Sequence, residues 1–263
     1  MLSFSLSSES FSPILAYTVS KHSQKGVDEV TVLHPHINEE MIRDVQEIRQ
    51  FYYDLLTQLW SQEPNRRLLS HLRQYLDEDV MPLADEEPLL MRGIRQMAES
   101  LIMTDQKDTE AEAMHWDYTR MFVGPFELPA PPWASAYKDD GRMLFQDETI
   151  QVRRAYAKYG YQVQHIGQVA EDHIGLELEF MSHLIKESSD QMNDDLTRTK
   201  EILRDQVIFL EQHLHSWISL FAKDVREAAR TTFYKGCADL LEGWLLLDRQ
   251  LQDALYQALE ESE

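Results

Sequence analysis

Glu171, Asp172 and His173 are three consecutive residues whose side chains could do chemistry. A carboxylate beside an imidazole can transfer protons, but such a pair also needs a nucleophile or a bound electrophile nearby, and the sequence offers neither. A carboxylate can instead accept an arginine in a bidentate, charge-assisted pair, which gives orientation as well as affinity. We therefore expect no catalytic residue. We expect one carboxylate of the triplet to face outward as an arginine acceptor, with His173 orienting it or donating to a peptide carbonyl.

The same triplet also has a structural interpretation. It stands at the start of a helix that we expect to open at Ala170, where Glu171 and Asp172 suit the positive end of the helix dipole. Either carboxylate could also cap the first backbone amides of that helix. The sequence leaves both interpretations open.

Metal-binding patterns are weak in this chain. A carboxylate-bridged di-iron bundle needs two Glu-x-x-His elements on different helices, and only Glu112 with His115 fits. His213 and His215 lie two residues apart, so on a helix they diverge and cannot chelate one ion. The sequence also has no glycine-rich phosphate loop and no Gly-x-Ser-x-Gly elbow. We expect neither metal nor cofactor; the alternative is an all-α metal protein or enzyme that uses His173 and nearby carboxylates.

A proline-rich loop precedes the triplet. Its prolines are Pro125, Pro129, Pro131 and Pro132. Because such a loop has little chain entropy left to lose, it can hold Phe126, Trp133 and Tyr137 as a preformed apolar surface for a peptide. We expect Trp133 to line a surface groove, whereas Tyr118 and Phe122 share one face of the preceding helix and are expected in the core.

The elements that must position these residues are helical throughout. Apolar residues at helical spacing predict helices from Asn38 to 59, from Pro64 to 76, around 89–101, up to Phe122, from Asp147 to 156, at 171–188, at 194–226 with a break near Ser216, and at 231–260. No strand alternation persists and no repeat of fixed period occurs. The fold class is predicted to be all-α, a single-domain helical bundle. Exchange of helices between subunits through the loop at 188–195 is an additional possibility.

Composition restricts the compartment. The single cysteine, Cys237, excludes a disulfide framework and a cysteine zinc site, which favours a reducing environment. No apolar run approaches membrane-spanning length, and no basic residue precedes Lys21, so neither a membrane anchor nor a secretory signal is supported. We expect a cytoplasmic protein without stable membrane insertion.

The charge is strongly acidic and unevenly distributed. The formal net charge is −21, of which residues 1–38 contribute only −1. Such a field repels nucleic acid and anionic lipid and attracts cationic partners. Residues 1–38 lack a helix cap and a clear helical period, so we assign them to an N-terminal extension and residues 39–263 to the helical domain. The extension is either a docking arm, a swapped element or a loosely packed tail.

Several separated motifs resemble one family. They are Tyr118-Thr-Arg-Met-Phe-Val-Gly-Pro125, Pro129-Ala-Pro-Pro-Trp-Ala-Ser-Ala-Tyr137 and Glu171-Asp-His-Ile-Gly-Leu-Glu-Leu-Glu-Phe-Met181, with His213-Leu-His-Ser-Trp217 and Thr232-Phe-Tyr234 as further markers. Together they closely resemble the TorD/DmsD family of redox-enzyme maturation chaperones over roughly residues 39–250. The Pro-Pro-Trp stretch points to the DmsD-like branch. This chain has Ala170 where the family often has Pro, and Phe126 and Tyr137 where DmsD-like members often have Trp.

The resemblance implies a function and a site. Members are all-helical cytoplasmic chaperones, not enzymes, that bind the twin-arginine signal peptide of a molybdopterin-dependent oxidoreductase precursor, of the DMSO/TMAO reductase kind. They hold the apo form of the catalytic subunit until its cofactor is inserted, and so delay export. The implied partners are this precursor and the export machinery, with the chaperone itself a monomer or homodimer. The implied signal-peptide-binding residues are Phe126, Pro132, Trp133, Tyr137, Glu171, Asp172 and His173.

Overall fold

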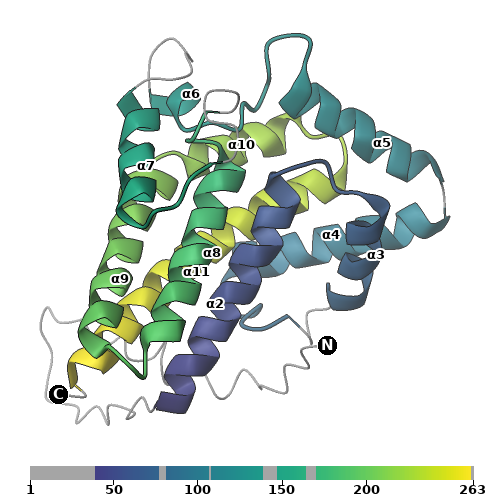
Figure 1. Cartoon of the computed structure of the whole chain (residues 1–263). Helices are drawn as coiled ribbons and strands as arrows, with labels where there is room; N and C mark the ends of the chain where they lie inside the picture. Colours follow the sequence, from purple (N-terminus) through teal and green to yellow (C-terminus); the bar gives the residue numbers. More distant parts are fainter. Residues whose placement is uncertain (1–38, 77–80, 107, 139–146, 164–169, 262–263) are drawn as a thin grey trace, which may run out of the picture.

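The regular structure of the described residues is entirely helical (Figure 1). The computed structural model describes residues 39–76, 81–106, 108–138, 147–163 and 170–261. Its α-helices are α2 (Glu39–Trp60), α3 (Arg66–Tyr75), α4 (Pro88–Gln106), α5 (Asp108–Tyr118), α6 (Ser135–Lys138), α7 (Asp147–Lys158), α8 (Ile174–Gln191), α9 (Leu196–Phe209), α10 (Ile218–Ala228) and α11 (Thr232–Glu261). Two π-helical turns, η2 (Thr119–Val123) and η3 (Leu210–Leu214), follow α5 and α9. The prediction of an all-α fold is confirmed.

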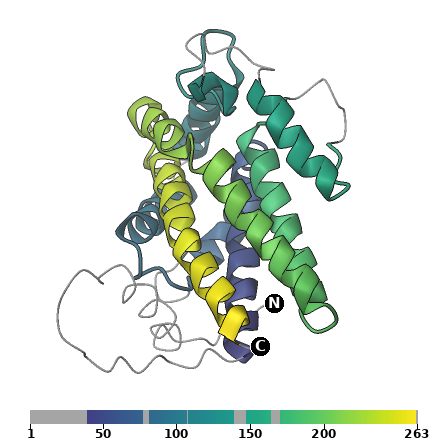
Figure 2. The same ribbon diagram turned by 90° about the vertical axis from the view of Figure 1, so that its left-hand side faces the viewer.

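The long helix α11 forms the centre of the bundle. It packs against α2, α4, α9 and α10, while α8 packs against both α2 and α9. Figure 2 shows α11 running beside α9. The periodic apolar residues used to predict the helices supply this core: Ile48, Ile94 and Leu178 are fully buried.

Glycines allow α4 and α11 to approach each other at backbone distance. A Cβ atom on Gly243 would lie 2.4 Å from the backbone nitrogen of Leu90, and one on Gly93 would lie 2.5 Å from that of Leu240. Both distances are far shorter than van der Waals contact. The two helices therefore fit together only because these positions carry no side chain.

A buried polar network crosses the core between α2, α8, α9 and α11. Arg49 and Asp248 form an ion pair in which both side chains are fully buried, with 2.5 Å between Arg49 Nε and Asp248 Oδ1. Arg49 Nη1 also donates to the side-chain oxygens of Gln46 and Gln206, and Tyr53 Oη donates to Asp248. Nearly all N–H donors of Arg49 are used in these hydrogen bonds. The two buried charges are therefore compensated within the network.

Several predicted helix boundaries can be compared with the structure. The break near Ser216 is confirmed, since η3 ends at Leu214 and α10 begins at Ile218. The prediction that Pro64 starts the second helix was wrong. Asn65 caps α3 by accepting a hydrogen bond from the Leu68 N–H at 3.0 Å, which leaves Pro64 outside the helix.

The start of α8 was also predicted wrongly. The helix begins at Ile174, with His173 as its N-cap, so Glu171 and Asp172 precede the helix instead of forming its first turn. Residues 1–38, including the predicted cap Asn38, lie outside the described residues. Exchange of helices between subunits stays a prediction, because the structure contains one chain.

Candidate functional site

The start of α8 is tied to the proline-rich loop by a short backbone pairing. The Ile174 N–H donates to the Pro132 carbonyl and the Ala134 N–H donates to the Asp172 carbonyl, both at 3.0 Å. Trp133 and His173 thereby form an isolated antiparallel bridge. The two segments singled out in the sequence are therefore neighbours in space, and residues 170–173 form a turn, closed by the His173 N–H donating to the Ala170 carbonyl at 3.2 Å, before the helix begins.

His173 caps α8 with its ring. Its Nδ1 accepts a hydrogen bond from the Gly175 N–H at 3.1 Å. Burial lowers the pKa of His173 to about 4, and the nearby Asp172 carboxylate only partly offsets this effect. The imidazole is therefore neutral at pH 7, and since Nδ1 is an acceptor, Nε2 carries the proton.

Asp172 faces the interior. Its side chain is fully buried, and its two oxygens accept hydrogen bonds from the Ser135 N–H at 2.8 Å and from Thr149 Oγ1 at 2.9 Å. The carboxylate thus joins the start of α6, α7 and the residues before α8. In this geometry Asp172 connects the elements of the site, and both of its oxygens already accept hydrogen bonds from the protein.

Glu171 is held by an internal arginine. Its side chain is almost completely buried, and Oε1 accepts from Nε and Nη2 of Arg153 at 2.8 and 2.7 Å. Oε2 has no hydrogen-bond partner among the described residues. The sequence suggested Glu171 as an acceptor for an external arginine. One of its two oxygens, Oε1, is thus already bound by the guanidinium group of Arg153.

A cavity of about 320 Å³ opens beside this junction. Its walls are Trp60 and Ser61 at the end of α2, Tyr118 and Phe122 around η2, Pro132 and Trp133 in the loop, Val163, and His173 and Leu176 at the start of α8. The rings of Trp133 and His173 meet edge to face, with their centroids 5.5 Å apart. This volume suits a short stretch of peptide with one or two side chains. We call it the junction cavity.

The structure separates the seven predicted site residues into three groups. Pro132, Trp133 and His173 line the junction cavity. Asp172 and Glu171 lie behind it in internal contacts. The remaining two are outside it: Tyr137 stacks on Trp217 with 5.5 Å between ring centroids, and Phe126 is 86% exposed on the loop surface.

Three cavity residues were assigned differently from the sequence. Tyr118 and Phe122 belong to the core as predicted, but both also form part of the cavity wall. Trp60 was not singled out, because its place in the apolar helical pattern of α2 indicates only burial. It is indeed 5% exposed, yet it borders the cavity. No sequence signal distinguishes such a wall residue from an ordinary core residue.

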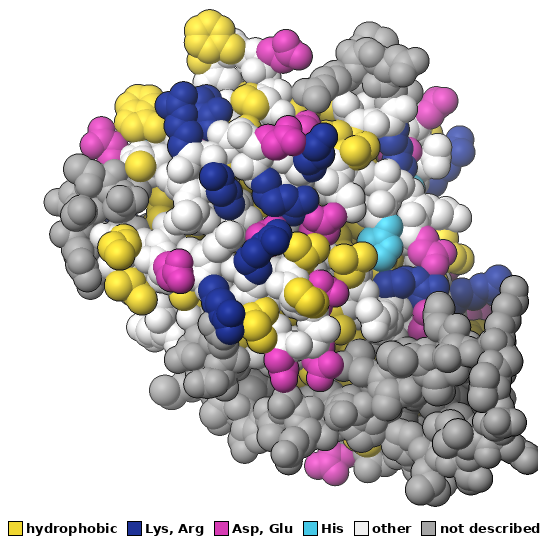
Figure 3. Space-filling model, turned by 180° about the vertical axis from the view of Figure 1, so that it is seen from behind, with side chains coloured by type: hydrophobic (Ala, Val, Ile, Leu, Met, Phe, Trp, Pro, Cys, Tyr) yellow, Lys and Arg dark blue, Asp and Glu magenta, His cyan; other side chains and the backbone are white. Residues whose placement is uncertain are grey.

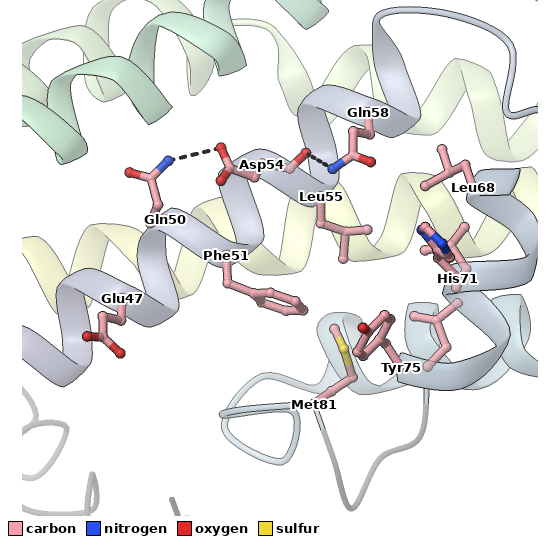
Figure 4. A pocket seen from close by; sticks show the side chains of 12 residues that line it. Glu47, Gln50, Phe51, Asp54, Leu55, Gln58, Leu68, His71, Tyr75 and Met81 are labelled. Atoms are coloured by element: carbon pink, nitrogen blue, oxygen red, sulfur yellow. Dashed lines mark hydrogen bonds between the residues drawn. The ribbon is translucent and has the colours of Figure 1, made fainter. Parts of the chain in front are cut away.

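A second cavity, of about 420 Å³, lies between α2 and α3 (Figure 4). Phe51, Leu55, Tyr75 and Met81 contribute to its largely apolar lining. Its carboxylates come from Glu47 and Asp54, and Asp54 accepts hydrogen bonds from Gln50 at 2.9 Å and Ser182 at 2.6 Å. None of the predicted site residues borders it, so we assign the candidate site to the junction cavity.

The histidines considered as metal ligands have partners within the protein. His213 Nδ1 lies 3.1 Å from a Glu148 oxygen that also contacts Lys138 at 2.6 Å, and His215 Nε2 lies 3.0 Å from the Leu245 carbonyl oxygen. Within the described part of the chain, no group of three or more His, Cys, Asp or Glu side chains is arranged to hold a metal ion. No helix in that part is long and apolar enough to span a membrane.

The chain is thus an all-α bundle with an aromatic-lined cavity where the proline-rich loop meets the start of α8, and it can now be compared with known proteins. The model of the family described as nitrate reductase delta subunit matches residues 83–223. The chaperone protein TorD of Vibrio cholerae serotype O1 is 28% identical over 176 residues, which is 66% of this chain and 78% of the relative. TorD of Shewanella oneidensis is 26% identical over 213 residues, or 79% and 92% of the two chains.

The chain belongs to the nitrate reductase delta subunit family, the family of the TorD/DmsD redox-enzyme maturation chaperones. The relatives are named as chaperones, which is a non-enzymatic role and agrees with the expectation that the protein is not an enzyme. A crystal structure described as a redox enzyme maturation protein from Archaeoglobus fulgidus matches more weakly. Its TM-score is 0.39 at 18% identity, over 90% of this chain and 99% of that chain.

Acidification is expected to destabilise the protein through His173. The pKa of His173 is about 4 in the folded protein and about 6.5 when it is unperturbed. Because the folded protein binds this proton less readily, stability is complete above pH 6.5 and is lost as the pH falls toward 4. His173→Asn keeps a good N-cap without a titrating ring. Over that pH range the unfolding free energy of the wild type should fall by up to about 3 kcal/mol more than that of the variant, measured by urea unfolding. Parallel pH curves would contradict the assignment.

Proposed function

We propose that the protein is a cytoplasmic chaperone for the precursor of a molybdopterin-dependent oxidoreductase. It binds the twin-arginine signal peptide of that precursor and holds the apoenzyme until the cofactor is inserted and export can proceed. Membership of the chaperone family supports the coarse role. The single observation that supports a peptide ligand is the junction cavity, which Pro132, Trp133 and His173 border together.

The seven predicted residues have different parts in this proposal. Trp133, Pro132 and His173 contact the peptide directly, and Phe126 extends the apolar surface outside the cavity. Asp172 and Glu171 position these groups: Asp172 accepts from the Ser135 N–H at the start of α6, directly after the loop, and Glu171 accepts from Arg153 on α7. Tyr137, stacked on Trp217, anchors the end of the loop to the core.

The overall charge favours a cationic partner. A twin-arginine signal is basic at its start and apolar in its centre, and the chain carries a formal net charge of −21. The charge is not uniform, however. Lys and Arg side chains gather toward the middle of the face shown in Figure 3, so that face is a poorer candidate for docking a cationic peptide.

Calorimetry with a synthetic twin-arginine signal peptide tests the proposal. The peptide should bind, a Lys-Lys version should bind more weakly, and Trp133→Ala should reduce affinity by about 1–3 kcal/mol because it removes an aromatic anchor. Trp116→Ala is the matched control, since Trp116 is 60% exposed on α5 and is not part of the cavity wall. Failure of the wild-type protein to bind any such peptide would refute the proposed function, and equal binding by both variants would exclude Trp133 from the site.

A further inference from the structure

We propose that the cavity between α2 and α3 is the docking site for a segment of this chain's own N-terminal extension, residues 11–25. We call this cavity the α2–α3 groove and this segment the basic arm. Residues 1–38 lie outside the described residues, whereas the residues of α2 and α3 that line the groove are described. The apolar floor of the groove, the carboxylates on its rim and the place where α2 begins support this docking, which does not depend on the proposed function.

The floor of the α2–α3 groove is apolar and partly open to solvent. The groove has a volume of about 420 Å³, which exceeds the volume of about 320 Å³ of the junction cavity. Figure 4 shows Phe51 and Leu55 of α2 facing Tyr75 of α3 across it. Tyr75 is 42% exposed and Phe51 is half-buried, so aromatic surface remains in contact with water. Covering such surface is favourable, and the groove therefore suits an occupant with apolar side chains.

Two carboxylates on the rim of the groove form no ion pair with any described residue. Glu47 and Asp54 are exposed and lie two turns apart on one face of α2. Glu47 makes no hydrogen bond within the described part of the chain. The Asp54 carboxylate accepts only from the neutral side chains of Gln50 and Ser182. No Lys or Arg is among the described residues that line the groove. Because exposed ion pairs add little affinity, the rim selects the sign of an occupant's charge while the apolar floor supplies the affinity.

The basic arm has the matching composition. Residues 10–27 contain no Asp or Glu, and Lys21 and Lys25 are the only Lys or Arg residues of the whole extension. Their formal charge of +2 is opposite to the charge of −2 on Glu47 and Asp54. The apolar side chains that precede the two lysines are Phe11, Ile14, Leu15, Ala16, Tyr17 and Val19. The remainder of the extension has no Lys or Arg, so the arm is its only part that combines an apolar run with positive charge.

The extension joins the bundle close to the groove. The helix α2 begins at Glu39, and Glu47, the first residue of α2 that lines the groove, lies about 12 Å further along the helix axis. Residues 26–38 connect the basic arm to α2 and can span up to about 43 Å. The arm can therefore reach the whole groove of its own chain. A tether that spans two sites gives an effective concentration on the order of 1 mM, which a second copy or a free peptide would have to match.

Cysteine pairs in the full-length chain test the docking. The native Cys237 is buried, and burial raises the pKa of its thiol, so it does not react with a maleimide. Ala16→Cys places a thiol in the apolar run of the arm, and Gln58→Cys places one at the groove. A short bismaleimide should join these two thiols within one chain. Gln151→Cys, exposed on α7, replaces Gln58→Cys in the matched control and should be joined to Ala16→Cys about tenfold more slowly.

Charge reversal tests whether the rim selects the arm. Lys21→Glu combined with Lys25→Glu should slow the joining of Ala16→Cys to Gln58→Cys about threefold, because attraction to the rim becomes repulsion. Adding Glu47→Lys to the same chain should restore much of the lost rate. A joining rate that does not respond to either change would contradict the charge complementarity and overturn the assignment of the arm to the groove.

Other occupants of the groove would give different results, each of which overturns the proposal. Equal joining rates at Gln58→Cys and Gln151→Cys would show that the arm is not held at the groove. Products that join two chains would assign the groove to the arm of a second copy. If the arm shows no preference but the added peptide acetyl-Leu-Leu-Lys-Lys-amide protects Gln58→Cys from alkylation, the groove belongs to a separate basic partner. Because none of these measurements uses the twin-arginine signal, the proposed function stands or fails separately.

Discussion

Replacing Arg49 by Met is expected to destabilise the fold by about 3–5 kcal/mol, the usual cost of removing one partner from a fully buried ion pair. The variant leaves Asp248 without its principal counter-charge at a place where both side chains are completely buried. It also removes the donor shared by Gln46 and Gln206. Urea unfolding followed by circular dichroism measures the change.

A surface arginine provides the control for Arg49. Arg204→Met makes the same substitution at an exposed position of α9 and should change the unfolding free energy by no more than about 0.5 kcal/mol. The double variant Arg49→Met with Asp248→Leu should recover part of the lost stability, because neither charge is then left buried alone. A loss below 1 kcal/mol for Arg49→Met would show that the network contributes little.

Gly243→Ala should also destabilise strongly, by about 3 kcal/mol. In an uncrowded helix the same substitution would stabilise by roughly 1 kcal/mol, so the sign of the effect is decisive. Here the new methyl would lie 2.4 Å from the Leu90 nitrogen and 2.9 Å from the Leu89 carbonyl carbon, and only a shift of a whole helix can relieve contact with backbone atoms.

Thermal or urea unfolding measures the Gly243 effect, and a second change in the same helix checks its origin. Gln250 is exposed on α11, so Gln250→Ala should be close to neutral. If Gly243→Ala were as stable as the wild type or more so, α4 and α11 would not be packed at backbone distance.

The sequence predicts the helices well because their apolar residues recur with the helical period. Residues such as Ile48, Ile94 and Leu178 signal their burial locally, and the structure confirms it. The start of α8 could not be predicted in the same way. His173 caps the helix through its ring nitrogen and is bridged to Trp133, 40 positions earlier, so a tertiary contact fixes the point at which the helix begins.

The site was only partly predictable for the same reason. Trp133 borders the junction cavity, and the sequence suggested a position at a groove because a loop with adjacent prolines is a poor place to bury a large ring. The partners of Asp172 lie 37 and 23 residues away, and nothing in its local sequence shows that both of its oxygens are engaged. Trp60 has the same local pattern as a core residue, and its role in the cavity wall follows only from how α2 meets the loop.

The contact between Arg153 and Glu171 limits how firmly Oε1 of Glu171 could hold a second arginine. An external guanidinium group that bound Glu171 through Oε1 would have to displace the internal one, which makes two hydrogen bonds of 2.7–2.8 Å to that oxygen. The hydrogen bonds broken with Arg153 and those formed with the external arginine would be similar. Only the difference in free energy between the two contacts would then contribute to binding. Such an exchange is easily reversed. At this oxygen, replacing one arginine by another would therefore change the free energy of the protein only slightly.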